Sequence, residues 1–271
     1  MPELPEVETT RRGIAPHLLG RCVRTVVIRN PHLRWTVPLA LATELPGQTL
    51  HAVERRAKYL LLRTGHGTVI VHLGMSGSLR VVDESLPAGP YDHVDLVFSG
   101  GKCLRLRDPR RFGAILWTQT DPAQHALLRD LGPEPLAPEF TAAWLGACMH
   151  GRRAAVRDLL LNARIVAGVG NIYANEALFR AGIRPGRRGG RLSHADCSRL
   201  VSSIRVILRR AIAAGGTTLR DFQNAEGDPG HFQRALSVYG RAGNPCRRCG
   251  TPVKALAIGQ RRAFFCPHCQ R

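Results

Sequence analysis

The chain has 271 residues, enough for two domains that each bury a hydrophobic core. It carries 39 Lys and Arg residues against 20 Asp and Glu residues, so the formal net charge is +19 and the isoelectric point is about 11.1. This excess predicts a polyanionic partner, either nucleic acid or, as the alternative, an anionic membrane surface. No apolar run has the length of a spanning helix, and Met1-Pro2-Glu3 does not begin a signal peptide, so we expect a cytosolic protein that does not bind membranes.

The first eight residues, Met1-Pro2-Glu3-Leu4-Pro5-Glu6-Val7-Glu8, are the most informative stretch. Once Met1 is removed, Pro2 carries a secondary amine with a pKa near ~8, so part of it is an uncharged nucleophile at neutral pH. Such an amine attacks an aldehyde-like carbon and gives an iminium, while Glu3 and Glu6 could supply protons or electrostatic support. The same residues also fit an ordinary helix start, with proline and acids in the first turn. The residues alone leave both interpretations open.

The N-terminal half predicts one helix followed by short strands. Apolar spacing predicts the helix over 4–18, and the period then falls toward two. We expect strands over 21–29, 49–63, 68–73, 94–98, 104–107 and 114–117, with hairpin turns at 65–67 and 99–102. Several short strands separated by turn signals favour an antiparallel sandwich or barrel, with little further helix.

Three stretches on these strands and loops could carry chemistry. Lys58, in Arg55-Arg56-Ala57-Lys58-Tyr59-Leu60, could transfer protons or could be a solvated strand end. All but three of the basic residues are arginines, and a site that must lose a proton cannot use arginine, which favours the chemical role. Met75, between two glycines, fits either a loop tip or core filling. Phe112, in Asp108-Pro109-Arg110-Arg111-Phe112-Gly113, fits either a wedge that enters a base stack or an ordinary charged turn.

The stretch 131–138 contains three prolines and a glycine and breaks any periodic element, so we place a domain boundary there. Beyond it we expect helices over about 139–150, 153–162, 171–181 and 193–214. Gly168-Val169-Gly170-Asn171 precedes the third helix and leaves backbone N–H groups for an anion such as phosphate. Glycine-rich helix starts are common, so this signal is weak alone.

Four cysteines near the C-terminus form two Cys-x-x-Cys pairs, Cys246 with Cys249 and Cys266 with Cys269. Sixteen residues separate the pairs, which is typical of a four-cysteine zinc ribbon that holds one structural Zn²⁺. Redox dithiols are the alternative, but neither pair lies in a βαβ pattern. We expect the segment between the pairs to be a hairpin with its tip at 259–262.

These motifs together resemble the bacterial formamidopyrimidine-DNA glycosylases, and the resemblance covers nearly the whole chain. It implies a base-excision-repair enzyme that binds damaged double-stranded DNA as a monomer, removes oxidised purines such as 8-oxoguanine, and cleaves the abasic site by β,δ-elimination. In that family the N-terminal proline is the nucleophile and the next glutamate is the acid, which corresponds to Pro2 and Glu3. Lys58 matches the lysine of proton transfer, and Glu6 is assigned to positioning or electrostatics.

The resemblance also implies DNA contacts. Met75, Arg110 and Phe112 would fill the gap left when the damaged nucleotide is flipped out. Arg152 and Arg157 stand where lysines are usual, and Asn171 matches an asparagine that touches phosphate in the helix–two-turn–helix element. Tyr91 stands where the family commonly has a DNA-contacting histidine. The arginine of the final elimination corresponds to Arg261, although Arg262 replaces the usual glycine after it, so a slip to Arg262 stays open.

We therefore predict an α+β protein: a catalytic β-sandwich domain with a leading helix over 1–131, a linker over 132–138, a helix–two-turn–helix domain over 139–240 and a zinc-finger hairpin over 241–271. Two other functions remain possible at this point. One is an endonuclease VIII-like glycosylase for oxidised pyrimidines, which would share Pro2, Glu3 and the zinc site. The other is a non-catalytic zinc-ribbon DNA-binding protein.

Overall fold

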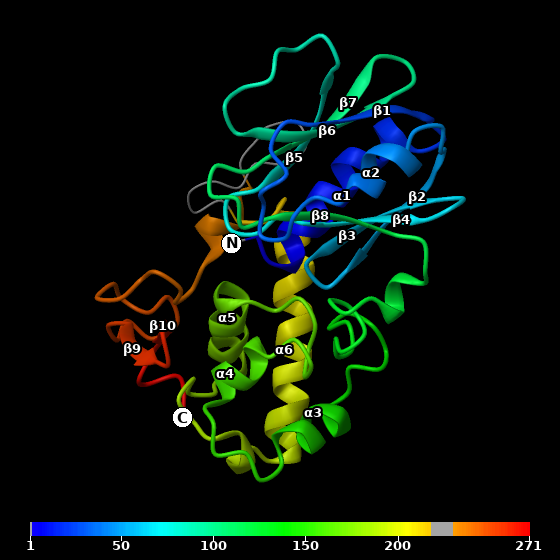
Figure 1. Cartoon of the computed structure of the whole chain (residues 1–271). Helices are drawn as coiled ribbons and strands as arrows, with labels where there is room; N and C mark the ends of the chain where they lie inside the picture. The colour runs from blue at the N-terminus through cyan, green and yellow to red at the C-terminus, as the bar shows by residue number, and fades with distance from the viewer. Residues whose placement is uncertain (1, 218–229) are drawn as a thin grey trace. The chain divides into compact units, whose positions relative to one another are not determined.

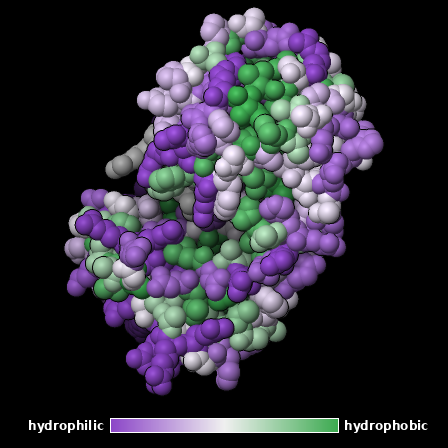
Figure 2. Space-filling model, viewed as in Figure 1, coloured by the Kyte–Doolittle hydropathy of each residue, from purple (hydrophilic) through white to green (hydrophobic). Residues whose placement is uncertain are grey.

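The computed structural model describes residues 2–217 and 230–271 (Figure 1). The chain divides into two compact units, the first made of residues 1–129 with 212–233 and the second of residues 130–211 with 234–271. The predicted domain bounds at 131, 138 and 240 remain a prediction. Among the described residues, no helix combines the length and the apolar character needed to cross a membrane. Hydrophilic residues cover much of the face drawn in Figure 2, as expected for a chain in which 22% of residues are charged.

The first unit is a β-sandwich with a leading helix, as predicted. One antiparallel sheet has the strand order β1-β6-β7-β5 and the other the order β2-β3-β4-β8 (Figure 1). The elements in chain order are α1 (Leu4–Leu18), β1 (Val23–Ile28), α2 (Leu39–Glu44), β2 (Leu50–Arg56), β3 (Tyr59–Thr64), β4 (Thr68–His72), β5 (Ser78–Asp83), β6 (Asp92–Phe98), β7 (Lys102–Arg107) and β8 (Ala114–Thr118), followed by a 3₁₀ turn, η1 (Pro122–Gln124).

One hydrophobic core joins α1 to both sheets. Val7, Ile14 and Leu18 of α1 pack in the same buried cluster as Leu60 of β3 and Leu106 of β7. Their spacing puts them on one face of the helix, which explains why the periodic pattern predicted the element correctly. The start of α1, which carries Pro2 and Glu3, is thereby anchored to the sandwich core.

The strand predicted over 49–63 is wrong in one respect, because it is two strands. Arg56 pairs with Tyr59, so Ala57 and Lys58 form a two-residue hairpin turn between β2 and β3. Ala57 has φ 54°, a conformation that glycine or asparagine usually supplies in such turns. Because neither glycine nor asparagine stands at this position, the sequence pattern did not predict the turn. The sequence pattern did not predict α2 or β5.

The second unit is mainly helical and ends in a two-stranded hairpin. Its elements are α3 (Ala142–Met149), α4 (Val156–Leu161), α5 (Asn171–Ala181), η2 (Gly189–Arg191), α6 (His194–Ala213), η3 (Phe232–Ala235), β9 (Lys254–Ile258) and β10 (Arg261–Phe265). The last two residues of α6 and the first two of η3 belong to the first unit. The four predicted helices are present, each shorter than or close to its expected range. The hairpin turn is narrower than predicted, because Arg261 and Arg262 are already the first residues of β10.

Candidate active site and nucleic-acid interface

The N-terminus is buried at the start of α1. Pro2 is buried, and the Glu3 side chain is only 3% exposed. Glu3 and Glu6 form a capping box, in which the Glu3 N–H donates to Glu6 Oε2 at 2.8 Å and the Glu3 side chain accepts from the Glu6 N–H. The other oxygen of Glu6, Oε1, accepts a hydrogen bond from the Thr217 N–H at 2.7 Å. Glu6 therefore fixes two backbone segments, the one directly after Pro2 and the one at Thr217.

A chain of polar contacts connects α1 to the turn that carries Lys58. Glu8, in α1, pairs with Arg11, Arg12 and Arg55. Arg55 Nη1 donates to the Ala57 carbonyl at 3.1 Å, directly before Lys58. Burial raises the pKa of the Glu8 carboxyl, but the hydrogen bonds and charges of these arginines outweigh it and lower the pKa to about 2. Glu8 is thus ionised at neutral pH and holds the Lys58 turn against α1.

His72 lies next to this turn at the end of β4. Its ring packs against Tyr59 with centroids 4.8 Å apart, and its Nδ1 accepts the Gly74 N–H at 3.1 Å. Burial, followed by the charges of Lys58 and Arg34, lowers the pKa of His72 to about 4. A neutral His72 therefore supports the backbone at Gly74, immediately before Met75.

Asp108 holds the two loops that were predicted to enter the DNA. It is fully buried, and its Oδ1 accepts from Ser76 Oγ at 2.7 Å and from the Arg110 N–H at 3.3 Å. Its Oδ2 accepts from the Gly113 N–H at 2.7 Å. A side chain at Gly74, which has φ 62°, would collide with the backbone of Phe112 about 2.3 Å away. The Met75 loop and the Phe112 loop are therefore packed against each other.

The apolar and aromatic side chains predicted for DNA contact in this unit lie at the surface. Met75, Tyr91 and Phe112 are 39%, 43% and 45% exposed, so each presents a large side chain to solvent. The Arg110 guanidinium lies over the Phe112 ring at 4.9 Å, and that of Arg107 lies over the Tyr91 ring at 5.3 Å. Exposed apolar tips with guanidinium groups beside them can enter a base stack and contact phosphates.

In the second unit, α5 holds the hairpin strand β10. Asn171 Nδ2 donates to the Arg262 carbonyl at 3.0 Å, and Asn175 Oδ1 accepts the Phe264 N–H at 2.7 Å. Asn171, predicted to touch phosphate, is thus also a support for the hairpin. Arg152, Arg261 and Arg262 are exposed, so their guanidinium groups are accessible to an anion.

Arg157 requires a correction. We predicted a phosphate contact, but Arg157 is 1% exposed and its Nη2 donates to the carbonyls of Ile258 and Arg261 at 2.6 and 3.0 Å. Its Nη1 lies 3.1 Å from Asp158 Oδ1. A buried guanidinium cannot reach a DNA backbone, so the prediction is wrong. Arg157 instead holds the backbone on both sides of the hairpin turn, at Ile258 in β9 and at the exposed Arg261 in β10.

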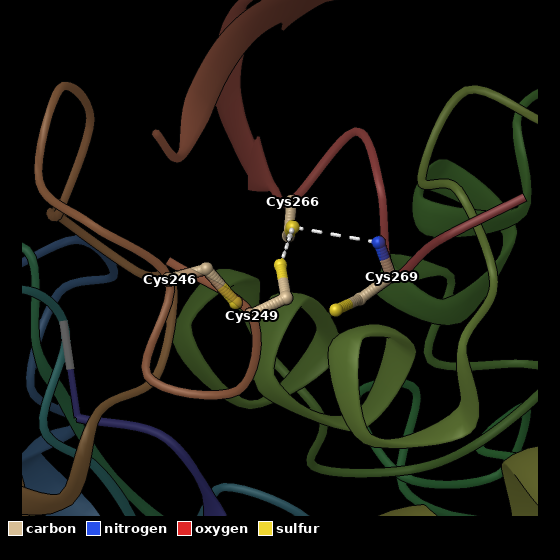
Figure 3. Close-up of side chains that lie close together, drawn as sticks. All are labelled: Cys246, Cys249, Cys266 and Cys269. Atoms are coloured by element: carbon tan, nitrogen blue, oxygen red, sulfur yellow. Dashed lines mark hydrogen bonds between the residues drawn. The ribbon is translucent and has the colours of Figure 1, made fainter. Parts of the chain in front are cut away.

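The four C-terminal cysteines converge on one point (Figure 3). Cys246 and Cys249 come from one loop, Cys266 directly follows β10, and Cys269 comes three residues later; their sulfur atoms all lie within 4.8 Å of one another. Four thiolates at Zn–S distances of ~2.3 Å have sulfurs roughly 3.8 Å apart, so the cluster fits a tetrahedral zinc ion. Gln270 supports it, since its Oε1 accepts the Cys266 N–H at 2.9 Å.

Three family models match successive parts of the chain. They are the formamidopyrimidine-DNA glycosylase N-terminal domain over residues 1–115, the H2TH domain of that family over 131–223, and the zinc finger found in FPG and IleRS over 243–271. Formamidopyrimidine-DNA glycosylases of Thioalkalivibrio sulfidiphilus and Nitrosococcus oceani are 56% and 53% identical to the chain, each over the full length of both proteins.

The chain belongs to the formamidopyrimidine-DNA glycosylase family. Solved members have the same fold: the MutM (Fpg) protein of Thermus thermophilus is 39% identical with a TM-score of 0.89, covering 99% of this chain and 98% of that one. Lactococcus lactis Fpg bound to abasic-site DNA is 32% identical with a TM-score of 0.91 over the whole of both chains. The four cysteines are thus the zinc-finger ligands of this family, and a site closed by four protein ligands is structural.

Several supporting residues of this family member were missed at the sequence level. They include Glu8, Asp108 and Asn175, described above, and also Glu176. Glu176 is 1% exposed, and its two carboxylate oxygens accept the N–H groups of Ser237, Val238 and Tyr239 at 2.8–2.9 Å. The sequence does contain a signal for this support, namely a carboxylate among apolar residues of a helix, as in Ala174-Asn175-Glu176-Ala177-Leu178. Buried acids are almost always paired, so such a residue indicates a backbone support.

Proposed function

We propose that the chain is a base-excision-repair DNA glycosylase that removes oxidised purines, such as 8-oxoguanine and formamidopyrimidines, from duplex DNA and then cleaves the abasic site. The observation that carries the proposal is the buried Pro2-Glu3 start of α1 in a chain that belongs to this family. The relatives at 53–56% identity are named for removal of formamidopyrimidines, and a solved relative from Lactococcus lactis holds DNA that contains Fapy-dG.

Base removal begins with extrusion of the damaged nucleotide, since the sugar carbon is inaccessible in an intact stack. We assign to Met75 and Phe112 the role of filling the space that the extruded nucleotide leaves in the base stack. Arg110 would hold the orphaned base or a neighbouring phosphate, and Tyr91 and Arg152 would contact phosphates. Asp108 supports this step indirectly, because it fixes both loops before DNA arrives and so reduces the ordering cost of binding.

The chemical step requires that Met1 has been removed. The Pro2 nitrogen then attacks C1′ of the sugar, the C1′–N9 bond breaks, and the base leaves with its electron pair and takes up a proton. Glu3 donates a proton to the ring oxygen as the sugar opens, which produces an iminium between Pro2 and C1′. Glu6 is a positioning residue in this scheme, because its oxygens hold the Glu3 and Thr217 backbones rather than the reacting atoms.

The iminium withdraws electrons from C2′, so loss of a C2′ proton expels the 3′ phosphate and loss of a second proton from C4′ expels the 5′ phosphate. We assign proton transfer in the first elimination to Lys58 and assistance of the final one to Arg261. Water then releases the sugar remnant from Pro2. The zinc ion takes no part in these steps; its four cysteines hold the hairpin that carries Arg261.

Borohydride trapping tests the proposal, because borohydride reduces only an imine to a permanent crosslink. After mass spectrometry confirms loss of Met1, we expect a covalent complex on duplex DNA with 8-oxoguanine opposite cytosine. The complex should disappear in Pro2→Gly, and Glu3→Gln should slow base release far more than cleavage of a preformed abasic site. Tight DNA binding with no trapped complex, by a correctly processed protein, would instead favour a non-catalytic zinc-ribbon protein.

Removal of oxidised pyrimidines is a second candidate activity of the same site. A solved relative, Lactococcus lactis Fpg, holds DNA that contains an oxidised pyrimidine and is 33% identical with a TM-score of 0.91. We propose that the purine activity dominates. Parallel single-turnover assays on 8-oxoguanine and on 5-hydroxycytosine would decide this, since a faster rate on the pyrimidine would reverse the assignment.

The proposed working state is a monomer bound to damaged double-stranded DNA, in the cytoplasm beside the chromosome. All of the predicted catalytic and DNA-contacting residues come from one chain, so the scheme needs no second subunit. Sedimentation of the complex with a short duplex tests this assignment, for which we expect one protein per lesion.

A further inference from the structure

A basic groove opens in the second unit, at the end of α5 distant from Asn171. Its volume is about 480 Å³, and the residues that line it are Arg180, Ser198, Arg199, Ser202, Ser203 and Arg248, with Ala181. A second groove of about 460 Å³ shares Ser198 and Ser202 with it and adds Arg209. No acidic residue lines either groove.

Two of the three arginines lack a compensating anion. Within the described part of the chain, neither the Arg180 nor the Arg248 guanidinium forms an ion pair, whereas Arg199 pairs with Asp196. Arg248 is nevertheless held in place, because its guanidinium lies over the Phe179 ring at 4.9 Å. A fixed, unpaired guanidinium that faces a groove is a binding group with little ordering cost.

Ser203 adds an independent observation. It is 5% exposed as a residue and lines the groove. Its hydroxyl oxygen is not among the buried side-chain atoms that lack a hydrogen-bond partner, so it is not a buried, unpaired group. A hydroxyl that lines the groove can donate a hydrogen bond to an anion bound there.

Guanidinium and hydroxyl groups around a shallow groove are the donors that bind phosphate. Protein partners, in contrast, usually need aromatic or aliphatic anchors in a pocket, and the groove of Arg180 and Arg248 contains only Ala181 as an apolar residue. Arg180 follows Asn171 by nine residues on α5, a rise of roughly 13 Å, so the groove is separate from the predicted phosphate contact at the start of that helix. We propose that this groove binds the phosphodiester backbone of a second DNA segment.

The consequence is a protein that can hold one duplex at its catalytic face and touch another, a route for transfer between DNA segments. The test uses the zinc-loaded full chain saturated with a short duplex that carries a tetrahydrofuran abasic-site analogue. A labelled, undamaged 30-base-pair duplex is then titrated in, and sedimentation and anisotropy report a ternary complex. The proposal predicts that the ternary complex forms with the unmodified protein at low salt.

The decisive variant is Arg180→Gln with Arg248→Gln. We expect its affinity for the second duplex to fall about tenfold and the slope of log affinity against log salt to decrease by about 2, one for each lost phosphate contact. Ser203→Ala should weaken the second duplex less and leave the slope unchanged, because it removes no charge. Bound zinc at one equivalent confirms that the knuckle containing Arg248 is intact.

The matched control is Arg129→Gln with Arg210→Gln, which removes two exposed arginines outside the groove. An equal loss in this control would mean that net charge alone attracts the second duplex, and the proposal would fall. Absence of a ternary complex in the unmodified protein would also overturn it, as would displacement of the second duplex by millimolar inorganic phosphate equally well in every variant. None of these readouts uses trapping or base release, so failure here is separate from failure of the proposed activity.

Discussion

The two regions that we propose to face DNA are supported by buried charges of opposite sign. In the first unit, the Asp108 carboxylate collects donors, namely the Ser76 hydroxyl and the N–H groups of Arg110 and Gly113. In the second unit, the Arg157 guanidinium collects acceptors, the carbonyls of Ile258 and Arg261. A loop that turns back on itself points either its N–H groups or its carbonyls inward, and the sign of the buried charge matches whichever it presents.

Zinc is the largest difference between these regions, because within the described residues only the hairpin adjoins a cluster of side chains that can hold a metal ion. Structural zinc contributes roughly 10 kcal/mol or more to the folding of such small units. Chelation, or Cys266→Ser, should therefore unfold the hairpin while the sandwich stays folded. Hydrogen exchange measured by mass spectrometry should show complete loss of protection over 254–265 and unchanged protection over 59–72. Loss of protection in both regions would mean that the metal supports the whole chain.

Asp108→Leu should be the next largest effect. It leaves buried donors unpaired, so we expect the free energy of unfolding of the first unit to fall by about 3 kcal/mol. Excision of 8-oxoguanine should fall with it, because Met75 and Phe112 lose their support. Asp108→Asn is the matched control: its carbonyl oxygen keeps the donors on one side of the carboxylate and its NH2 group loses those on the other, so we expect a loss of about 1–2 kcal/mol in urea denaturation. Equal effects of the two substitutions would show that shape, not hydrogen bonding, is what Asp108 provides.

Arg157→Met should have a smaller and more local effect. The change leaves the Ile258 and Arg261 carbonyls without a donor, at a cost of about 2 kcal/mol to the hairpin turn. Amide exchange at 259–262 should accelerate by more than tenfold at constant zinc content. Arg157→Lys should restore part of the protection, since its ammonium can reach one carbonyl. Equal exchange rates at 259–262 in Arg157→Met and Arg157→Lys would show that the charged donor of Arg157 does not support the turn.

Glu8→Gln tests a buried charge that is balanced by arginines rather than by backbone groups. The pKa of Glu8 is about 2 in the folded chain against 4.5 ordinarily. Its ionisation therefore stabilises the fold above pH 4.5, and the gain disappears as the pH falls through about 2. We expect Glu8→Gln to lose about 1–2 kcal/mol in urea denaturation at pH 7 and almost nothing near pH 2. A loss independent of pH would show that packing, not charge, is responsible.

Local patterns in the sequence predicted much of this structure. Helical spacing located α1 and the four helices of the second unit, and the cysteine spacing located the metal cluster. Motifs singled out Met75, Tyr91 and Phe112, which the structure shows to be exposed, while their contact with DNA stays a prediction. The buried supporting residues were not predicted from the sequence. Whether Arg157 reaches a phosphate or the carbonyl of Ile258, 101 residues away, depends on the tertiary fold. The Ala57–Lys58 turn was not predicted because alanine, not glycine, adopts the positive φ that this turn requires.

The position of Lys58 in a two-residue turn has a practical consequence for chemical labelling. The chain has three lysines, and the other two are Lys102 at the start of β7 and Lys254 at the start of β9. Amine-directed reagents such as acetyl esters therefore produce only a few modified peptides, with Lys58 in a peptide of its own after proteolysis at arginine. The acylation rate of Lys58, with and without damaged DNA, becomes a direct test of whether DNA covers this turn in the unmutated protein.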